Sequence, residues 1–129
     1  MGIEVTMLAW SVILGLVLIA LAATGGIAQR GVIWAISSRE GKAAALSGVA
    51  GRLARGAQNF LETFPLFAVA VLALLVLGKE DAMSALGVQL YFWSRVAYAL
   101  VYAAGINYLR TVVWAVSIAG IVLVLVALL

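Results

Sequence analysis

Cysteine and histidine are both absent from this chain of 129 residues. Their absence excludes disulfide bonds, a thiolate nucleophile supplied by the protein, and acid/base catalysis by imidazole. It also removes the side chains that hold zinc or haem at the usual kinds of site. We therefore expect no metal cofactor, and any sulfur chemistry would have to come from a ligand.

Charged residues and proline are scarce as well. Charged side chains make up 10% of the chain and there is one proline, whereas hydrophobic residues make up 67%. Apolar runs occupy residues 7–28, 60–77, 84–106 and 111–129. Each run approaches or exceeds the ~20 residues that a helix needs to cross a ~30 Å hydrocarbon layer. The composition thus predicts an all-α integral membrane protein.

We expect one domain, residues 1–129, built as a bundle of four transmembrane helices at about 7–28, 52–78, 84–106 and 111–129. The basic residues of the first connection are Arg30, Arg39, Lys42, Arg52 and Arg55. Because cytoplasmic loops carry an excess of Lys and Arg, this pattern places the first and third connections in the cytoplasm and both termini on the opposite side. The net charge of +3 is explained by this topology and by contact with anionic lipid head groups. We therefore do not expect nucleic-acid binding.

Two sets of polar side chains interrupt the apolar runs. The set on the second helix consists of Arg52, Arg55, Asn59 and Glu62. The set on the third helix consists of Arg95, Tyr98 and Tyr102. At 100° per residue each set lies within a sector of about 80° or less, so each occupies one helical face. Ionisable residues at membrane depth are costly and usually mark a functional site.

The two sets also match in depth, because each helical residue rises ~1.5 Å. Glu62 and Arg95 would both lie ~15 Å inside the membrane, and Arg55 and Tyr102 near its cytoplasmic surface. We expect Glu62 and Arg95 to form a buried ion pair, because either charge alone at the midplane costs several kcal/mol.

The cations exceed what that pair would neutralise. Those expected near the cytoplasmic mouth are Arg30, Arg52, Arg55 and Arg110. The missing anion would be a small cytosolic ligand with carboxylates for the arginines, an amine for Glu62, and amide groups for Asn59 and the tyrosine hydroxyls. Glutathione carries these groups, and the surrounding lipid would deliver an apolar co-substrate.

The segment Arg-Leu-Ala-Arg-Gly-Ala-Gln-Asn-Phe-Leu-Glu-Thr-Phe-Pro-Leu-Phe at 52–67 contains the spacing Arg-x-x-x-Asn-x-x-Glu. It resembles the signature of the MAPEG family, the membrane-associated proteins in eicosanoid and glutathione metabolism. Further support comes from Arg95-Val-Ala-Tyr98-Ala-Leu-Val-Tyr102, from Tyr108-Leu109-Arg110 followed by Trp114, and from Leu46-Ser47-Gly48. The resemblance covers nearly the whole chain and is greatest to the short bacterial members.

The resemblance implies a homotrimer in a bacterial inner membrane, with glutathione bound between neighbouring subunits on the cytoplasmic side. Members act as glutathione transferases, peroxidases or eicosanoid synthases. The residues that match family glutathione-binding positions are Arg55, Asn59, Glu62, Tyr98 and Tyr102. Arg95 matches an arginine that interacts with the family glutamate, and Arg30 and Arg52 are further candidates for cofactor binding.

Arg110 resembles the family arginine near the start of the fourth helix that stabilises the glutathione thiolate. A thiol with a pKa of ~8.5 is mostly protonated at neutral pH, and a nearby guanidinium favours the thiolate. Arg110 is therefore the catalytic candidate of a transferase or peroxidase acting on an apolar electrophile. Thr63 and Ala57 differ from the residues of some eicosanoid synthases, so specificity for eicosanoids is not expected.

Two other classes of function remain open. The polar residues can instead lock helices or protomers together, which would make the protein a structural bundle or a non-catalytic subunit of a larger membrane assembly. A single membrane carboxylate is also typical of small proton-coupled exporters, in which a glutamate alternates between a proton and a cationic drug. The surplus of arginines argues against an exporter.

Overall fold

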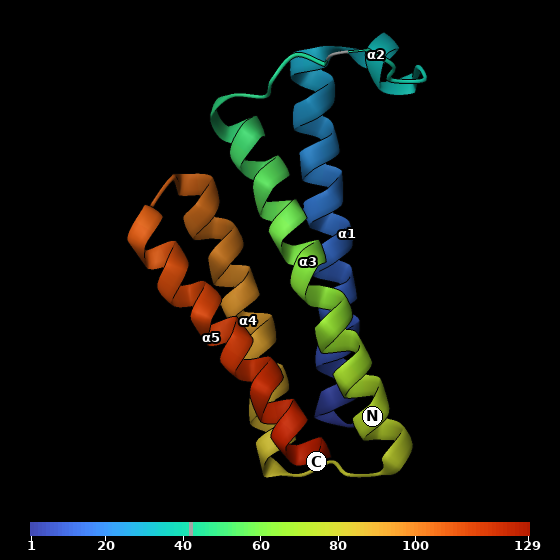
Figure 1. Cartoon of the computed structure of the whole chain (residues 1–129), viewed down its shortest axis with the longest axis vertical. Helices are drawn as coiled ribbons and strands as arrows, with labels where there is room; N and C mark the ends of the chain where they lie inside the picture. The colour runs from blue at the N-terminus through green and yellow to red at the C-terminus, as the bar shows by residue number, and fades with distance from the viewer. Residues whose placement is uncertain (42) are drawn as a thin grey trace.

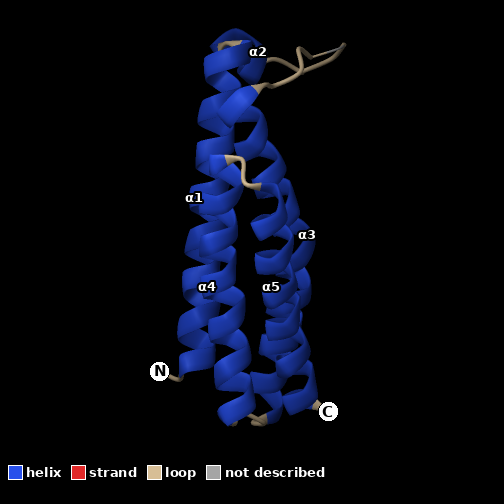
Figure 2. Ribbon diagram, turned by 90° about the vertical axis from the view of Figure 1, so that its left-hand side faces the viewer, coloured by secondary structure: helices blue, strands red, loops and turns tan. Residues whose placement is uncertain are grey.

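Helices account for nearly all of the computed structural model, which describes residues 1–41 and 43–129. Along the described chain they are α1 (Ile3–Arg30), α2 (Val32–Ile36), α3 (Gly48–Leu77), α4 (Ala82–Ala104) and α5 (Asn107–Leu128). The four long helices lie side by side in one elongated bundle (Figures 1 and 2). The short helix α2 projects from the end of α1.

The helix that carries the first polar set begins earlier than the sequence indicated. α3 starts at Gly48 rather than near residue 52, so Arg52 lies inside the first turns of the helix instead of at its start. Part of the first connection, for which the sequence predicted no helix, forms α2. Lys42, counted among the basic residues of this connection, lies outside the described residues.

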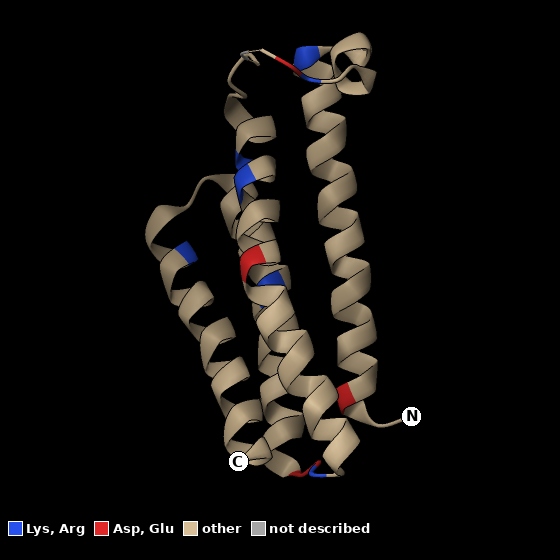
Figure 3. Cartoon of the chain, turned by 45° about the vertical axis from the view of Figure 1, so that its right-hand side comes forward, with Lys and Arg blue, Asp and Glu red and all other residues tan. Residues whose placement is uncertain are grey.

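Three of the helices, α1, α3 and α5, are long and apolar enough to cross a membrane. The sequence predicted four such spans, and the crossing by α4 stays a prediction. The helix has 23 residues, but it carries several polar ones along its length, among them Gln89 and Arg95. Figure 3 shows that charged residues are sparse on the long helices and gather mainly near their ends.

The packed core joins α1 and α3 to the N-terminal half of α4 and the C-terminal half of α5. Its fully buried apolar side chains are Phe67, Val71, Leu74, Val88, Tyr91 and Val124. Phe67, Val71 and Leu74 follow each other at intervals of four and three residues, so they share one face of α3. Phe67 stacks on Tyr91 with ring centroids 3.9 Å apart.

Helices α4 and α5 cross in close contact because both have glycine at the crossing point. A Cβ atom added to Gly120 would lie 2.6 Å from the carbonyl oxygen of Gly87, and one added to Gly87 would lie 2.7 Å from the oxygen of Gly120. Any side chain at either position would push the helices apart. Small residues of this kind allow close approach of membrane helices.

The ends of α4 are defined by specific local features. Asp81 caps its N-terminus in a capping box with Ser84, and Ser84 also donates a hydrogen bond of 2.6 Å to the buried carboxylate of Glu4 from α1. At the other end Gly105 adopts a left-handed conformation with φ of 81°, which ends the helix and allows the tight turn into α5.

Candidate functional site

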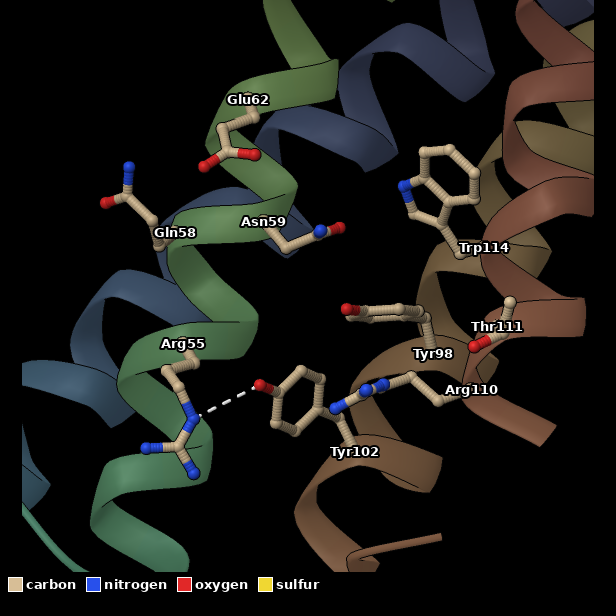
Figure 4. A pocket seen from close by; sticks show the side chains of 9 residues that line it. All are labelled: Arg55, Gln58, Asn59, Glu62, Tyr98, Tyr102, Arg110, Thr111 and Trp114. Atoms are coloured by element: carbon tan, nitrogen blue, oxygen red, sulfur yellow. Dashed lines mark hydrogen bonds between the residues drawn. The ribbon is translucent and has the colours of Figure 1, made fainter. Parts of the chain in front are cut away.

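A cavity opens between α3, α4 and α5. It has a volume of about 350 Å³, within the range of about 300 to 1,000 Å³ that is usual for small-molecule sites. Its lining residues are Arg55, Gln58, Asn59, Glu62, Tyr98, Tyr102, Arg110, Thr111 and Trp114. Figure 4 shows the α3 residues on one side and those of α4 and α5 on the other. We call this space the main cavity.

Six of the nine residues that the sequence singled out line the main cavity. They are Arg55, Asn59, Glu62, Tyr98, Tyr102 and Arg110. They come from three helices and from positions up to 55 residues apart, and the shared face predicted for each helix is what brings them together. Their role in binding stays a prediction.

A contact across the main cavity links the two polar sets. Arg55 donates a hydrogen bond from Nε to the hydroxyl oxygen of Tyr102 over 3.2 Å (Figure 4). This bond confirms that the two residues lie at the same level of the bundle. The guanidinium of Arg110 lies 4.7 Å from the centroid of the same ring, and Tyr98 meets Tyr102 edge to face at 5.5 Å. Two cations are thus held against one aromatic side chain.

Asn59 and Glu62 line the main cavity one and two turns beyond Arg55 along α3. The Oδ1 atom of Asn59 is buried without a hydrogen-bond partner among the described residues, and in Figure 4 its side chain points from α3 toward α4 and α5. A buried amide oxygen without a partner is unfavourable by about 1 to 3 kcal/mol. The site therefore has an acceptor available for a donor from outside the chain.

A smaller cavity of about 110 Å³ adjoins the main cavity at the α4–α5 turn, and the two share Arg55, Tyr102 and Arg110. Arg52 lines the smaller cavity only. Its Nε donates a hydrogen bond of 3.0 Å to the carbonyl oxygen of Ala103, near the end of α4. Arg52 therefore ties the start of α3 to the end of α4, although its side chain also borders the outer part of the site.

Arg95 does not form the ion pair that the sequence suggested. It is 1% exposed, and its Nε and Nη1 atoms have no hydrogen-bond partner among the described residues. Its guanidinium lies 4.3 Å from the ring centroid of Tyr98 and 5.6 Å from that of Phe60. Glu62 is exposed beside the main cavity. The expected pair fails because aromatic rings enclose Arg95 inside the bundle, while Glu62 faces the opening.

Arg30 lies away from both cavities. Its Nε donates to the carbonyl oxygen of Ala44, and its guanidinium lies 5.0 Å from the ring centroid of Trp34. The sequence placed Arg30 near the mouth because α1 ends there. In the structure its side chain holds the first connection instead.

Three lining residues were not predicted, namely Gln58, Thr111 and Trp114. Helical spacing contained the signal: Gln58 follows Arg55 by three residues, and Trp114 follows Arg110 by four. Tryptophan in membrane helices is commonly an interfacial anchor. The indole of Trp114 instead adds an apolar surface to the main cavity, on the side formed by α4 and α5 (Figure 4).

The described residues contain no group of three or more His, Cys, Asp or Glu side chains that could hold a metal ion. The main cavity offers two guanidiniums, one carboxylate, two amides, three hydroxyls and an indole. Such a set suits a zwitterionic ligand with more negative than positive charge.

The family model of the MAPEG family matches residues 7–129 of the chain. The chain belongs to the MAPEG family. Searches of curated proteins and of solved structures found no match. Together with the three apolar helices, the family match establishes this MAPEG protein as an all-helical integral membrane protein. It also agrees with the resemblance found in the segment 52–67.

Proposed function

We propose that this MAPEG protein binds glutathione in the main cavity and catalyses its transfer to an apolar electrophile, or the reduction of an apolar hydroperoxide. The observation that carries the proposal is the composition of the cavity, which is lined by two arginines, Arg55 and Arg110, by a single carboxylate, that of Glu62, and by Asn59 with its unpartnered oxygen. Glutathione has two carboxylates, one ammonium group and amide N–H donors, which complement this arrangement.

The proposed chemistry assigns one role to each group. Arg55 binds a carboxylate of glutathione, Glu62 its ammonium group, and Asn59 an amide N–H. Arg110 stabilises the thiolate, as a cation favours the charged form of a nearby thiol. In the transferase reaction the sulfur bonds to the electrophilic carbon and the leaving group departs. In the peroxidase reaction two glutathione molecules give the disulfide, an alcohol and water.

An apolar co-substrate fits the surroundings of the site. Trp114 lines the main cavity from α5 and is 39% exposed. Since the bundle lies in a membrane, its outer helical faces contact lipid, from which an apolar molecule can reach the cavity without crossing water. The electrophile is therefore expected to partition into the bilayer.

The protein is further proposed to be a homotrimer in a bacterial inner membrane, with all four long helices crossing it. An α4 of 23 residues is about 34 Å long, enough for a hydrocarbon layer of ~30 Å, and its most costly residue, Arg95, is buried inside the bundle. Both termini lie near the α3–α4 turn (Figure 1), which supports a topology with the first and third connections together on the other side of the membrane. The basic residues of the first connection favour the cytoplasm for that side.

Calorimetric titration of the detergent-purified protein with glutathione tests the proposal. We expect saturable binding that Arg55→Ala weakens about 10- to 100-fold, since a hydrogen bond to a charged group contributes about 1.5 to 3 kcal/mol. The matched control is Lys79→Ala, which removes a cation from the other end of the bundle and should bind normally. Size-exclusion chromatography checks that all three proteins have the same oligomeric state.

A structural role is the second candidate, because some of the polar residues do hold helices together. Arg52 bonds to the end of α4, and Arg95 is stacked between aromatic rings. This candidate predicts that wild-type protein of normal size binds no glutathione, and that Arg55→Ala changes the oligomeric state. An exporter predicts proton-coupled flux that disappears in Glu62→Gln, but a cationic drug would meet Arg55 and Arg110 in the main cavity.

A further inference from the structure

Helix α2 lies where the chain leaves the hydrocarbon layer. The 28 residues of α1 extend about 42 Å, which exceeds the ~30 Å of hydrocarbon, so the end of α1 reaches the headgroup layer. Only Gly31 separates α1 from α2. Among the helices of the described chain, α2 contacts α1 alone, and Figures 1 and 3 show it on the side of α1 away from α4 and α5.

The surface of α2 is strongly apolar and uncovered by the rest of the described chain. Val32 is 58% exposed, Ile33 83% and Ile36 80%. Three large aliphatic side chains exposed on five residues are unfavourable in water, because burying such side chains is favourable. At the edge of a bilayer the same side chains can enter the acyl chains.

Two arginines lie against the one aromatic residue of α2. The guanidinium of Arg30 is 5.0 Å and that of Arg39 is 5.6 Å from the ring centroid of Trp34. Arg39 reaches this position from a backbone φ of 58°, a left-handed conformation that is unusual for arginine. Two cations are thus gathered at one tryptophan, a residue enriched at membrane surfaces.

The hydrogen bonds of these arginines leave their charge available. Arg30 donates from Nε to the carbonyl oxygen of Ala44, and Arg39 donates from Nε and Nη2 to that of Ala35. Each guanidinium has five N–H donors, so both retain donors for an anionic acceptor. Carbonyl oxygens fix the position of the two groups without neutralising them.

We propose that α2 lies in the headgroup layer of the membrane, with Val32, Ile33 and Ile36 in the acyl chains and Arg30 and Arg39 bound to the phosphate of an anionic phospholipid. Lipid is the occupant because this surface adjoins a helix that crosses the bilayer, and because two cations complement the negative headgroups. The same anchor holds the first connection, which leads into α3 and the main cavity. This site is separate from the proposed glutathione site.

The depth of α2 can be measured directly because the chain has no cysteine of its own. Ile33→Cys is labelled with a nitroxide, and the full-length protein is reconstituted in nanodiscs of equal parts phosphatidylcholine and phosphatidylglycerol. We expect the label to be relaxed by oxygen, which concentrates in lipid, more than by a water-soluble nickel complex. The matched control is Glu80→Cys in the exposed α3–α4 turn, where the nickel complex should dominate.

A label at residue 33 that behaves like the control overturns the proposal, because α2 would then lie in water. Protection from both relaxing agents also overturns it, since a second copy of the chain would then cover the surface. Size-exclusion chromatography of each labelled protein confirms that the comparison is made on folded material.

The charge component is tested by the lipid that stays bound. Protein from these mixed nanodiscs is extracted in mild detergent, and the retained phosphatidylglycerol is measured relative to phosphatidylcholine by mass spectrometry. Because a cation near the surface contributes about 1 kcal/mol, Arg39→Gln should reduce the relative retention about fivefold, and a second change, Arg30→Gln, should reduce it further. Lys79→Gln, at the other end of the bundle, should have no such effect. Unchanged retention in the double variant overturns phosphate binding by these arginines.

Discussion

Buried polar groups have different surroundings in the two halves of the bundle. The packed half contains the core around Phe67 and Tyr91, and the open half contains the main cavity. In the packed half Ser84 bonds to Glu4, and the hydroxyl of Tyr91 lies 3.1 Å from that of Thr63. In the half that contains the main cavity, the buried polar atoms without a partner are Oδ1 of Asn59 and, at the boundary, Nε and Nη1 of Arg95. All the unpartnered buried side-chain atoms of the described residues thus lie in or beside the open half.

The contrast has a physical cause in how the helices approach each other. Gly87 and Gly120 allow α4 and α5 to touch in the packed half, and Phe67, Tyr91 and Val124 fill the space toward α3. Around the main cavity the described residues leave an open space that long polar side chains border. The packed half therefore contributes more to stability, whereas the half with the main cavity leaves buried polar atoms without a partner among the described residues.

Removing Arg110, the proposed stabiliser of the glutathione thiolate, should have the largest effect. We expect Arg110→Ala to lower the rate of glutathione transfer about 100- to 1,000-fold, the usual loss when one stabiliser of a developing anion is removed. Its free energy of unfolding should stay nearly unchanged. The rate is measured with a soluble aryl halide, and Arg110→Lys, which keeps the charge, serves as the control.

The pH dependence of this variant gives an independent readout. A cation lowers the pKa of a neighbouring thiol, so the wild type should hold a thiolate well below the ordinary pKa of ~8.5. In Arg110→Ala the pKa of the bound glutathione thiol, followed by ultraviolet absorbance of the thiolate, should rise toward that value. An unchanged thiol pKa in the variant would show that Arg110 does not stabilise the thiolate.

A change at the helix crossing should have a smaller effect, confined to stability. Gly120→Ala places a Cβ atom against backbone of α4, and overpacking of this kind typically costs about 1 to 3 kcal/mol. Gly26→Ala is the control, because no neighbouring atom lies within 4 Å of its added Cβ. Unfolding is measured in detergent, and glutathione affinity of the remaining folded protein should be normal. If Gly120→Ala lowered the affinity for glutathione together with stability, the packed half would also affect binding, and the two halves would not differ in role.

The smallest effect is expected from the hydroxyl pair in the packed core. Tyr91→Phe removes one member of the Thr63–Tyr91 hydrogen bond, which should lower the free energy of unfolding by about 1 kcal/mol. Thr63 also donates to the carbonyl oxygen of Phe60, which limits the loss. Tyr108→Phe, at a tyrosine that is 91% exposed, should be neutral. Equal effects of the two changes would show that the hydroxyl pair does not stabilise the core.

Sequence patterns predicted the parts of the site that depend on a single helix. Arg55, Asn59 and Glu62 share a face because the helical repeat is a local property, and the same holds for Tyr98 and Tyr102. Matching residues by depth also placed Arg55 opposite Tyr102, which their hydrogen bond confirms. The family assignment from the segment 52–67 was confirmed over residues 7–129.

The same patterns were wrong where the neighbouring helix decides the environment. Arg95 has nearly the same direction on α4 as Tyr98, yet rings of Phe60 and Tyr98 enclose it, and it does not meet Glu62. Helix α2 was missed because five residues are too few for a periodic pattern. Arg30 was predicted near the cytoplasmic mouth from its position at the end of the first helix. Its guanidinium instead lies over the ring of Trp34, which belongs to that unpredicted helix.

The sequence by itself determined the membrane class, the approximate places of the four long helices and the polar face of α3 and of α4. Each of these follows from composition or from a repeat of a few residues, which the chain carries regardless of its partners. The tertiary structure alone decided that α4 and α5 meet at Gly87 and Gly120, that Arg95 is enclosed, and that Arg110 joins Arg55 at Tyr102. These outcomes depend on contacts between distant segments, because the direction in which a helix side chain points does not say what the next helix places against it.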